Sequence, residues 1–237
     1  MNHELDHSFT VFSSEGKLKQ CDHALQAALN GSLSAGASAF NGCVLSSLKN
    51  LPLLVRSELI WKVNSICPTI GITYAGLQPD YRILYDKAVR MVEVYKDAYG
   101  RYPYLDVFVH NFCLKIQEYT QKGGLRPFGV MILICGPILQ NDTIKPALYQ
   151  IDTSGSFQML KVGSVGKDSD NARKFVERRL ESVDDNIFNC VGAIREFAGF
   201  SIGPTNVDIG VYFSDKNVFK VYSREEVNEV FDSILVK

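Results

Sequence analysis

The stretch YTQKGGLRPFGVMILICG, from Tyr119 to Gly136, decides the fold. It joins the end of an amphipathic helical pattern to a run of apolar residues. Gly123-Gly124 ends the helical pattern, because glycine readily adopts the backbone conformations that terminate a helix. Pro127 then favours an extended approach to the segment that follows. The apolar run beyond it is typical of a strand that is covered on both faces.

Arg126 stands directly before that proline, and the sequence leaves two interpretations of it open. In the first, Arg126 is a solvated cation of the turn. In the second, it pairs with a carboxylate and fixes the corner between helix and strand.

Composition and charge are those of an ordinary soluble globule. The chain has 237 residues with a net charge of −1, 46% of them hydrophobic and 22% charged. This balance favours neither nucleic acid nor an anionic membrane as a partner. No apolar run reaches the ~20 residues that span a bilayer, and the polar, acidic start MNHELDHSFTV is not typical of a secretory signal. With no linker or repeat, we expect one domain over 1–237.

Apolar periodicity and turn signals predict pairs of helices between groups of strands. Asn41-Gly42 lies between two short runs and indicates a hairpin, as do the turns at 153–155 and 214–217. Hairpins imply antiparallel sheets, and the doubly apolar run implies cover on both faces. The sequence therefore predicts two packed sheets with helix pairs outside them. We expect six helices. The first spans 15–30, the second begins at Pro79 and ends at Gly100, and the third carries the apolar stripe from Leu105 to Tyr119. The fourth and fifth span roughly 168–181 and 184–199, and the sixth is opened by Ser223.

The cysteines and histidines do not form a metal-binding pattern. Six cysteines occur without a C-x-x-C spacing, and most stand in apolar patterns, so we interpret them as buried reduced thiols. The histidines and cysteines do not form the four-ligand pattern of a structural zinc site, although His3 and His7 stand four positions apart. We expect neither a metal nor a cofactor.

Several segments resemble the alpha-type subunits of the proteasome core particle. The segment 10–32, TVFSSEGKLKQCDHALQAALNGS, is similar to their N-terminal signature, and YTQKGGLRPFGV resembles their Tyr-Thr-Gln-x-Gly-Gly-Val-Arg-Pro-Phe-Gly-Val block. IDTSG resembles their Asp-Pro-Ser-Gly turn, and GLQPDYRIL resembles one branch of these subunits in particular. The resemblance covers nearly the whole chain. It implies an α+β fold, a four-layer α-β-β-α sandwich, in agreement with the order of elements above.

The catalytic beta-type subunits share this fold, and they need an N-terminal threonine whose free α-amine acts as the base. A carboxylate and a lysine complete their site. Here the resemblance aligns these positions with Ser32, Leu48 and Lys62. The nitrogen of Ser32 is a peptide amide without basicity, and Leu48 carries no charge. Release of Ser32 by cleavage after Gly31 is disfavoured, because the preceding helix has its own apolar stripe. We therefore expect no catalytic residues and no enzymatic activity.

As an alpha-type subunit, the chain is expected in a seven-membered ring of different alpha-type subunits, stacked on a beta-type ring. The expected location is cytoplasm and nucleus. The first helix carries a stripe with Leu18, Leu25 and Leu29. The resemblance implies that this stripe packs between ring neighbours, and the alternative is that it lies on the chain's own sheet.

The resemblance also implies a gate and a pocket. Residues 1–12 are expected to be a gate tail, with Asp6, Ser14 and His23 at the positions of the family's gate cluster, of which only Asp6 is retained. Whether His23 bonds Asp6 or both are solvated stays open.

Gly31, Lys62 and Leu77 match a pocket for the C-terminal tail of a regulatory particle. The alternative for Lys62 is an ordinary surface lysine beside Trp61. Two other functions stay open for the chain, an active beta-type amino-terminal hydrolase and a free-standing binding domain of this fold.

Overall fold

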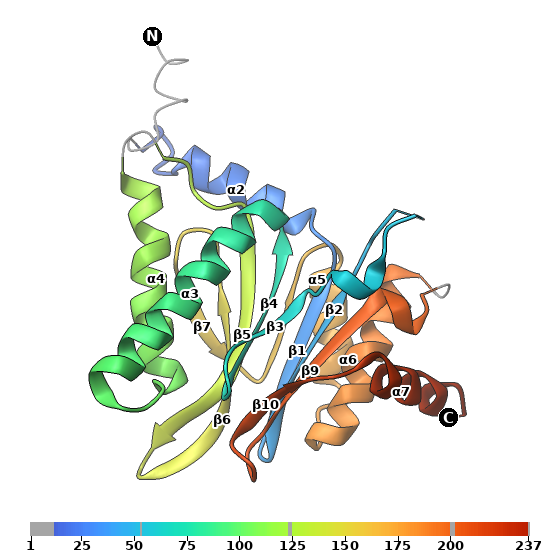
Figure 1. Cartoon of the computed structure of the whole chain (residues 1–237). Helices are drawn as coiled ribbons and strands as arrows, with labels where there is room; N and C mark the ends of the chain where they lie inside the picture. Colours follow the sequence, from blue (N-terminus) through green and yellow to red (C-terminus); the bar gives the residue numbers. More distant parts are fainter. Residues whose placement is uncertain (1–11, 53, 123–124, 200–201, 237) are drawn as a thin grey trace.

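The computed structural model describes residues 12–52, 54–122, 125–199 and 202–236. Within them, the expected order of elements is confirmed (Figure 1). The strands are β1 (Ser34–Ala39), β2 (Gly42–Leu48), β3 (Val63–Cys67), β4 (Ile70–Gly76), β5 (Val130–Gln140), β6 (Thr143–Ile151), β7 (Phe157–Leu160), β8 (Val162–Val165), β9 (Val207–Phe213) and β10 (Val218–Val221). The α-helices are α2 (Lys19–Leu29), α3 (Gln78–Tyr99), α4 (Leu105–Gln121), α5 (Ser169–Glu177), α6 (Val183–Ala198) and α7 (Arg224–Val236).

The strands form two five-stranded antiparallel sheets. The β1 sheet has the order β10-β9-β2-β1-β8, and the β5 sheet has the order β3-β4-β5-β6-β7. Helices α3 and α4 pack on the outer face of the β5 sheet, and α5 and α6 pack on the outer face of the β1 sheet. The predicted fold class is therefore confirmed as an α+β, four-layer α-β-β-α sandwich. Helix α2 lies across one end of the sandwich (Figure 1).

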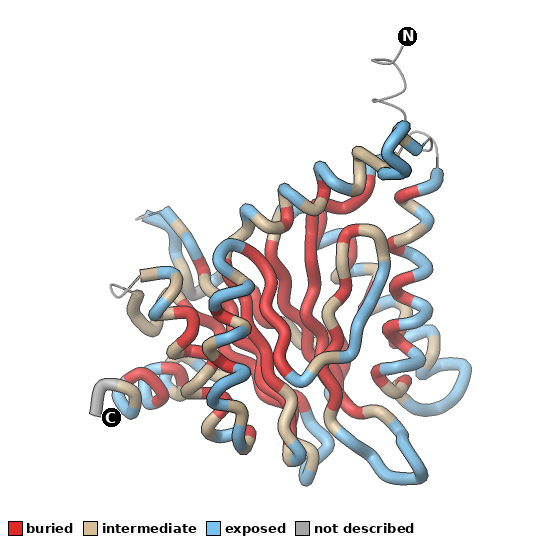
Figure 2. Tube along the Cα trace, turned by 180° about the vertical axis from the view of Figure 1, so that it is seen from behind, coloured by how far each residue is buried: buried red, intermediate tan, exposed pale blue. Residues whose placement is uncertain are grey.

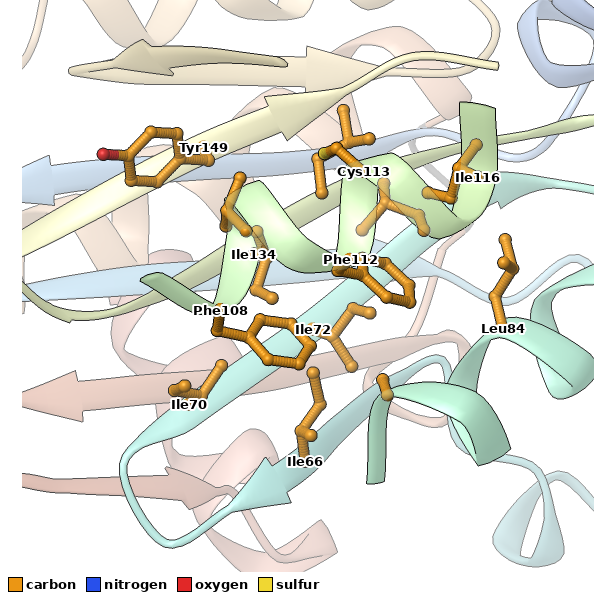
Figure 3. Packing of buried hydrophobic residues seen from close by; sticks show 14 of the residues in the cluster. Ile66, Ile70, Ile72, Leu84, Phe108, Phe112, Cys113, Ile116, Ile134 and Tyr149 are labelled. Carbon is orange, nitrogen blue, oxygen red and sulfur yellow. The ribbon is translucent and has the colours of Figure 1, made fainter. Parts of the chain in front are cut away.

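Strand β5 lies at the centre of this packing, because both of its faces are covered. Val130 to Pro137 are buried without interruption. Ile132 and Ile134 belong to the core that β5 forms with α3 and α4. Figure 3 shows Ile134 beside Phe108 and Phe112 of α4. Leu133, between them, belongs to the core between the two sheets. Figure 2 shows the buried strands as a continuous layer inside the helices. The prediction of a doubly covered strand is confirmed.

The hairpins follow local turn chemistry. The hairpin predicted from Asn41-Gly42 is confirmed, but its turn is Phe40-Asn41, because Gly42 already belongs to β2 and pairs with Ala39. The sequence analysis missed the hairpin between β5 and β6, where Asn141 and Asp142 have φ of 51° and 59°. Asn and Asp tolerate positive φ in such mirror-image turns better than other side chains do. The signal was therefore present as an Asn-Asp pair.

Two predicted helix boundaries were wrong. Helix α2 begins at Lys19 and not at residue 15, because residues 13–17 form a turn with Gly16 at φ +74° and Leu18 is extended. Helix α5 ends at Glu177 and not near residue 181. The segment after α5 is held by α6, because the side chain of Asn186 hydrogen-bonds the backbone N–H and carbonyl of Glu181.

The predicted capping box is confirmed in full at Ser223, whereas at Ser182 only the N-cap bond forms and the Asp185 carboxylate accepts from the Ser182 hydroxyl. Ser182 Oγ accepts a hydrogen bond from the N–H of Asp185 at the start of α6. At α7, Glu226 accepts from the N–H of Ser223, and Ser223 Oγ accepts in return from the N–H of Glu226. Gly123-Gly124, the predicted end of α4, lies outside the described residues, and α4 ends just before it at Gln121.

The corner at Arg126 is held by an ion pair, as the second interpretation predicted. Arg126 Nη1 and Nη2 lie 2.6 and 2.7 Å from the two carboxylate oxygens of Asp80, in the first turn of α3. The same carboxylate accepts from the N–H of Gly129 at 2.9 Å. The Asp80 side chain is 5% exposed and that of Arg126 is 56% exposed. Asp80 thus ties the entry of β5 to the start of α3.

These bonds also set the ionisation of Asp80. Burial by itself would raise its pKa, but the hydrogen bonds from Arg126 and Gly129 outweigh burial and hold the pKa below the usual range. The pair therefore contributes stability above pH ~4, the ordinary aspartate value, and loses it as the pH falls through the lower folded pKa.

Asp80→Asn is expected to lower the free energy of unfolding by about 1–3 kcal/mol at neutral pH, because it removes the charge from three hydrogen bonds. Exposure of Arg126 to water keeps the effect below that of a fully buried pair. Urea unfolding measures it. The matched control is Glu118→Gln, which breaks the exposed pair with Lys115 and is expected to leave the midpoint almost unchanged. Equal midpoints for wild type and Asp80→Asn at neutral pH would contradict this role for the corner.

Candidate functional site

Lys62 lies just before β3, inside the end of the sandwich. It is 6% exposed, so its interpretation as an ordinary surface lysine is wrong. Its Nζ lies 2.5 Å from Ser32 Oγ, 3.4 Å from the Ser32 carbonyl oxygen and 4.9 Å from the centre of the Tyr74 ring. Burial lowers the pKa of Lys62 to about 7, although Asp208 acts in the opposite direction. At neutral pH this lysine is poised between its charged and neutral forms.

A buried charge cluster lies behind Lys62. The backbone N–H of Lys62 donates to Asp208 Oδ2 at 2.7 Å. Asp208 Oδ1 lies 2.9 Å from Lys49 Nζ and 3.2 Å from Arg224 Nη1. The side chains of Lys49 and Asp208 are both fully buried. Trp61, 37% exposed, has Lys49 and Arg224 over its ring. This cluster connects β9, the end of β2 and the start of α7 to the start of β3.

Gly31 brings the end of α2 against β4. A Cβ atom at Gly31 would lie 2.1 Å from the nitrogen of Gly76, and one at Gly76 would lie 2.1 Å from the carbonyl oxygen of Gly129. Three backbones therefore meet here without side chains between them. Gly31 is thus adjacent both to Ser32, which contacts Lys62, and to Gly76, which precedes Leu77.

The predicted pocket residues share this neighbourhood but line separate hollows. Gly31 and Ser32 line a polar cavity of about 390 Å³ with Lys167 and Asp168. Leu77 lines a smaller groove of about 250 Å³ with His23 and Arg126, beside α2. Lys62 contacts Ser32 from inside the fold. The structure therefore joins Gly31 to Lys62, whereas Leu77 lies on the other side of the glycine contact.

The residues predicted for the gate are only partly described. Ser14 lies exposed in the turn before α2, and His23 is exposed on α2 beside the groove with Leu77. Asp6 and the tail 1–11 lie outside the described residues. A contact between His23 and Asp6 therefore stays a prediction.

The stripe of α2 lies partly on this chain's own core. Leu25 and Leu29 are half-buried and pack, with the fully buried Ala28, against the core between the sheets. Leu18 is half-buried ahead of the helix. Packing on the chain's own sheets, the alternative interpretation, therefore accounts for part of the burial of this stripe. Its role in ring assembly stays a prediction.

Over the described ranges, no group of three or more His, Cys, Asp and Glu side chains is arranged to hold a metal ion. All six cysteines are free, and all but Cys21 are buried. No helix in the described part of the chain is long and apolar enough to cross a membrane.

Ser32, Leu48 and Lys62 stand at the positions that the resemblance aligns with the catalytic residues of beta-type subunits. Ser32 follows α2 and Gly31 directly, so its nitrogen is part of the chain, and the half-buried Leu48 offers no carboxylate. The family model described as Proteasome subunit matches residues 29–212, which include all three positions. The chain belongs to the proteasome subunit family.

Relatives within the proteasome subunit family are similar over nearly their whole length. The proteasome subunit alpha type-2 of Saccharomyces cerevisiae is 41% identical, with 96% of this chain and 97% of the relative covered. The subunit alpha type-2 of Oryza sativa subsp. indica is 37% identical over 96% of each chain. Alpha type-2-A of Arabidopsis thaliana is 37% identical over 94% of each. The resemblance drawn from the sequence motifs is confirmed.

Sequence reasoning missed the cluster around Asp208. Its members are far apart in the chain, since the bond from Lys62 to Asp208 spans 146 positions. One local signal existed, because Asp208 stands in a strand otherwise made of apolar and small residues, VDIGVYF. A charge in such a strand indicates a buried partner.

Asp208→Asn is expected to destabilise the fold by about 3–5 kcal/mol, because it leaves the fully buried Lys49 and the partly buried Arg224 without their counter-charge. Thermal or urea unfolding measures the loss. The matched control is Asp215→Asn, an exposed aspartate in the turn after β9. Adding Lys49→Met to Asp208→Asn is expected to recover part of the loss, since one unpaired charge is removed. A change no larger than that of Asp215→Asn would contradict this assignment.

Proposed function

We propose that the chain is a non-catalytic, alpha-type subunit of a proteasome core particle. The observation that carries this proposal is Ser32, whose nitrogen is a peptide amide behind a packed helix. The base that an amino-terminal hydrolase requires is a free amine, and an amide does not supply it. Similarity to alpha type-2 subunits over nearly the full length supports the same function.

The proposed role is structural. The chain occupies one place in a seven-membered outer ring of different alpha-type subunits, stacks on a beta-type ring, and acts in the cytoplasm and nucleus. Leu18, Leu25 and Leu29 at or before α2 are proposed to contact a ring neighbour through the parts that the chain's own core leaves uncovered. Residues 1–12, with Ser14 and His23 nearby, are proposed to help close the entry pore.

The region of Gly31, Lys62 and Leu77 is proposed to receive the C-terminal tail of a regulatory particle. Lysine meets a terminal carboxylate as a compact point charge. The cavity beside Ser32 gives such a carboxylate an approach from the side of Gly31. Leu77, 44% exposed in the neighbouring groove, offers an apolar wall for a side chain of the tail.

One observation favours a second function, an active hydrolase. Ser32 Oγ and Lys62 Nζ are 2.5 Å apart, and a lysine with a pKa of about 7 is able to act as a general base. Against it, Leu48 occupies the position of the family's carboxylate. Removing the Ser32 hydroxyl distinguishes the two functions, because a hydrolase needs this group as its nucleophile and a scaffold subunit does not.

Ser32→Ala in the assembled core particle is expected to leave every peptidase activity of the particle unchanged, because this hydroxyl takes part in no reaction. Fluorogenic peptides for each specificity of the particle measure the rates, and native mass spectrometry checks that the variant subunit is incorporated. Loss of one activity from a correctly assembled particle would favour the hydrolase over the scaffold.

Lys62→Ala is expected to weaken stimulation of the particle by a regulator tail peptide about ten- to a hundredfold in affinity, the value of one charge-assisted hydrogen bond of about 1.5–3 kcal/mol. Basal hydrolysis is expected to stay normal. Lys62→Arg is expected to rescue binding only in part, because its planar head needs a different pocket shape. Unchanged affinity of all tested tails for Lys62→Ala would show that this pocket is not used.

A further inference from the structure

The buried charges around Lys62 do not balance. Among the described residues, the buried Lys49 and Lys62 and the partly exposed Arg224 supply up to three positive charges, and Asp208 supplies one negative charge. Asp208 is already shared, since Oδ1 faces Lys49 and Arg224 and Oδ2 accepts from the backbone of Lys62. Buried charges without a partner are costly, and they either lose their proton or gain a counter-ion.

Lys62 is the member of this cluster that lacks a carboxylate for its own head group. In the described part of the chain, its Nζ hydrogen-bonds Ser32, through the hydroxyl and the carbonyl oxygen. A hydroxyl serves both forms of the amine, because it accepts a bond from an ammonium group and donates one to a neutral amine. Ser32 is therefore a partner that holds the head of Lys62 in either protonation state.

The other groups near Lys62 Nζ come from several elements. Tyr74 on β4 lies under Nζ, and burial raises its pKa to about 12. Tyr81 on α3 stacks on Tyr74, and burial raises its pKa further above the usual value. Both phenols stay neutral between pH 6 and 8.5. Lys167 and Asp168 face the cavity beside Ser32 with opposite charges. Burial lowers the pKa of Lys49, but its Nζ contacts Asp208 directly.

We propose that a C-terminal carboxylate docking at Lys62 takes up a proton with it, so that tail binding weakens as the pH rises through neutrality. This inference rests on the tail-docking function proposed above. In the empty site, among the described residues, the buried amine hydrogen-bonds Ser32 and contacts no carboxylate directly. The arriving carboxylate supplies the missing negative charge, favours the ammonium form and accepts a hydrogen bond from Nζ. Ser32 is the positioning residue that keeps the head group in place before the tail arrives.

The sign of the pH dependence follows from this order of events. Below pH 7 the amine of the empty site is already protonated, so binding takes up no proton and its affinity is constant. Above that pH the empty site is neutral and the occupied site is charged, so each binding event takes up one proton. The fall in affinity then approaches about tenfold for each pH unit well above ~7, until the raised pKa of the occupied site is passed. The tail's own carboxylate stays ionised across this range.

The experiment uses the assembled core particle and a short N-acetylated peptide without histidine, with an apolar penultimate residue, a benzophenone side chain and a free C-terminus. The yield of photo-crosslinks to this subunit, measured by mass spectrometry against peptide concentration, reports binding at this pocket rather than at others in the ring. Titrations at pH 6, 7, 8 and 8.5 give the pH profile. The same peptide with a C-terminal amide is the ligand control.

Lys62→Met and Lys62→Arg are the protein controls. Methionine keeps most of the volume of the buried side chain without a charge, and arginine stays protonated throughout the range. The wild-type particle is expected to lose about fivefold in affinity between pH 7 and 8, because the protonated fraction of Lys62 in the empty site falls from about one half to about one eleventh. Both variants and the amide peptide are expected to give flat profiles. Weaker binding by Lys62→Met together with a flat wild-type profile would overturn proton uptake while leaving tail docking intact. The same slope in Lys62→Arg as in wild type would also overturn it. Equal binding by Lys62→Met and wild type at every pH would overturn tail docking itself.

Discussion

A single buried carboxylate, Asp208, joins the two sheets at the end of the sandwich where the candidate site lies. It belongs to β9 in one sheet, and it accepts a hydrogen bond from the backbone of Lys62, which opens the first strand of the other. It also holds Lys49 and the first residue of α7. The position of the site lysine is therefore set by electrostatics between layers as well as by the apolar core. The desolvation of these charges is offset only while all of them are present.

Much of the fold was predictable because its signals are local. The hairpin at Asn41, the helix opened by Pro79 and ended by Gly100, and the N-cap at Ser182 each depend on residues close together in sequence, and all three are confirmed. The start predicted for α2 was wrong for a related reason. An apolar stripe does not reveal that the chain before it turns at Gly16. The two carboxylate bonds of Arg126 span 46 positions, so the sequence predicted a partner without identifying Asp80.

The candidate site was predictable in its members but not in its environment. Family resemblance selected Gly31, Lys62 and Leu77, and the structure brings the first two together through Ser32. The burial of Lys62, and the separate hollows that Gly31 and Leu77 line, depend on how α2, β3 and β4 meet. Whether a lysine is a solvated cation or a titrating group is decided by atoms distant in sequence, here Ser32, Tyr74 and Asp208. No pattern within the segment around Trp61 carries that information.

The contact of Gly31, Gly76 and Gly129 has a mechanical consequence. Side chains normally absorb small displacements by changing rotamer, but here backbone meets backbone, with positions for Cβ atoms only 2.1 Å from the next chain segment. Such a column is stiff, and a shift at one end is passed on rather than damped. Gly31 adjoins the residue that contacts Lys62, and the N–H of Gly129 is bonded to the carboxylate that holds Arg126. Close backbone packing thus connects the surroundings of Lys62 with the corner at the entry to β5, so we expect a displacement at one of them to strain the other.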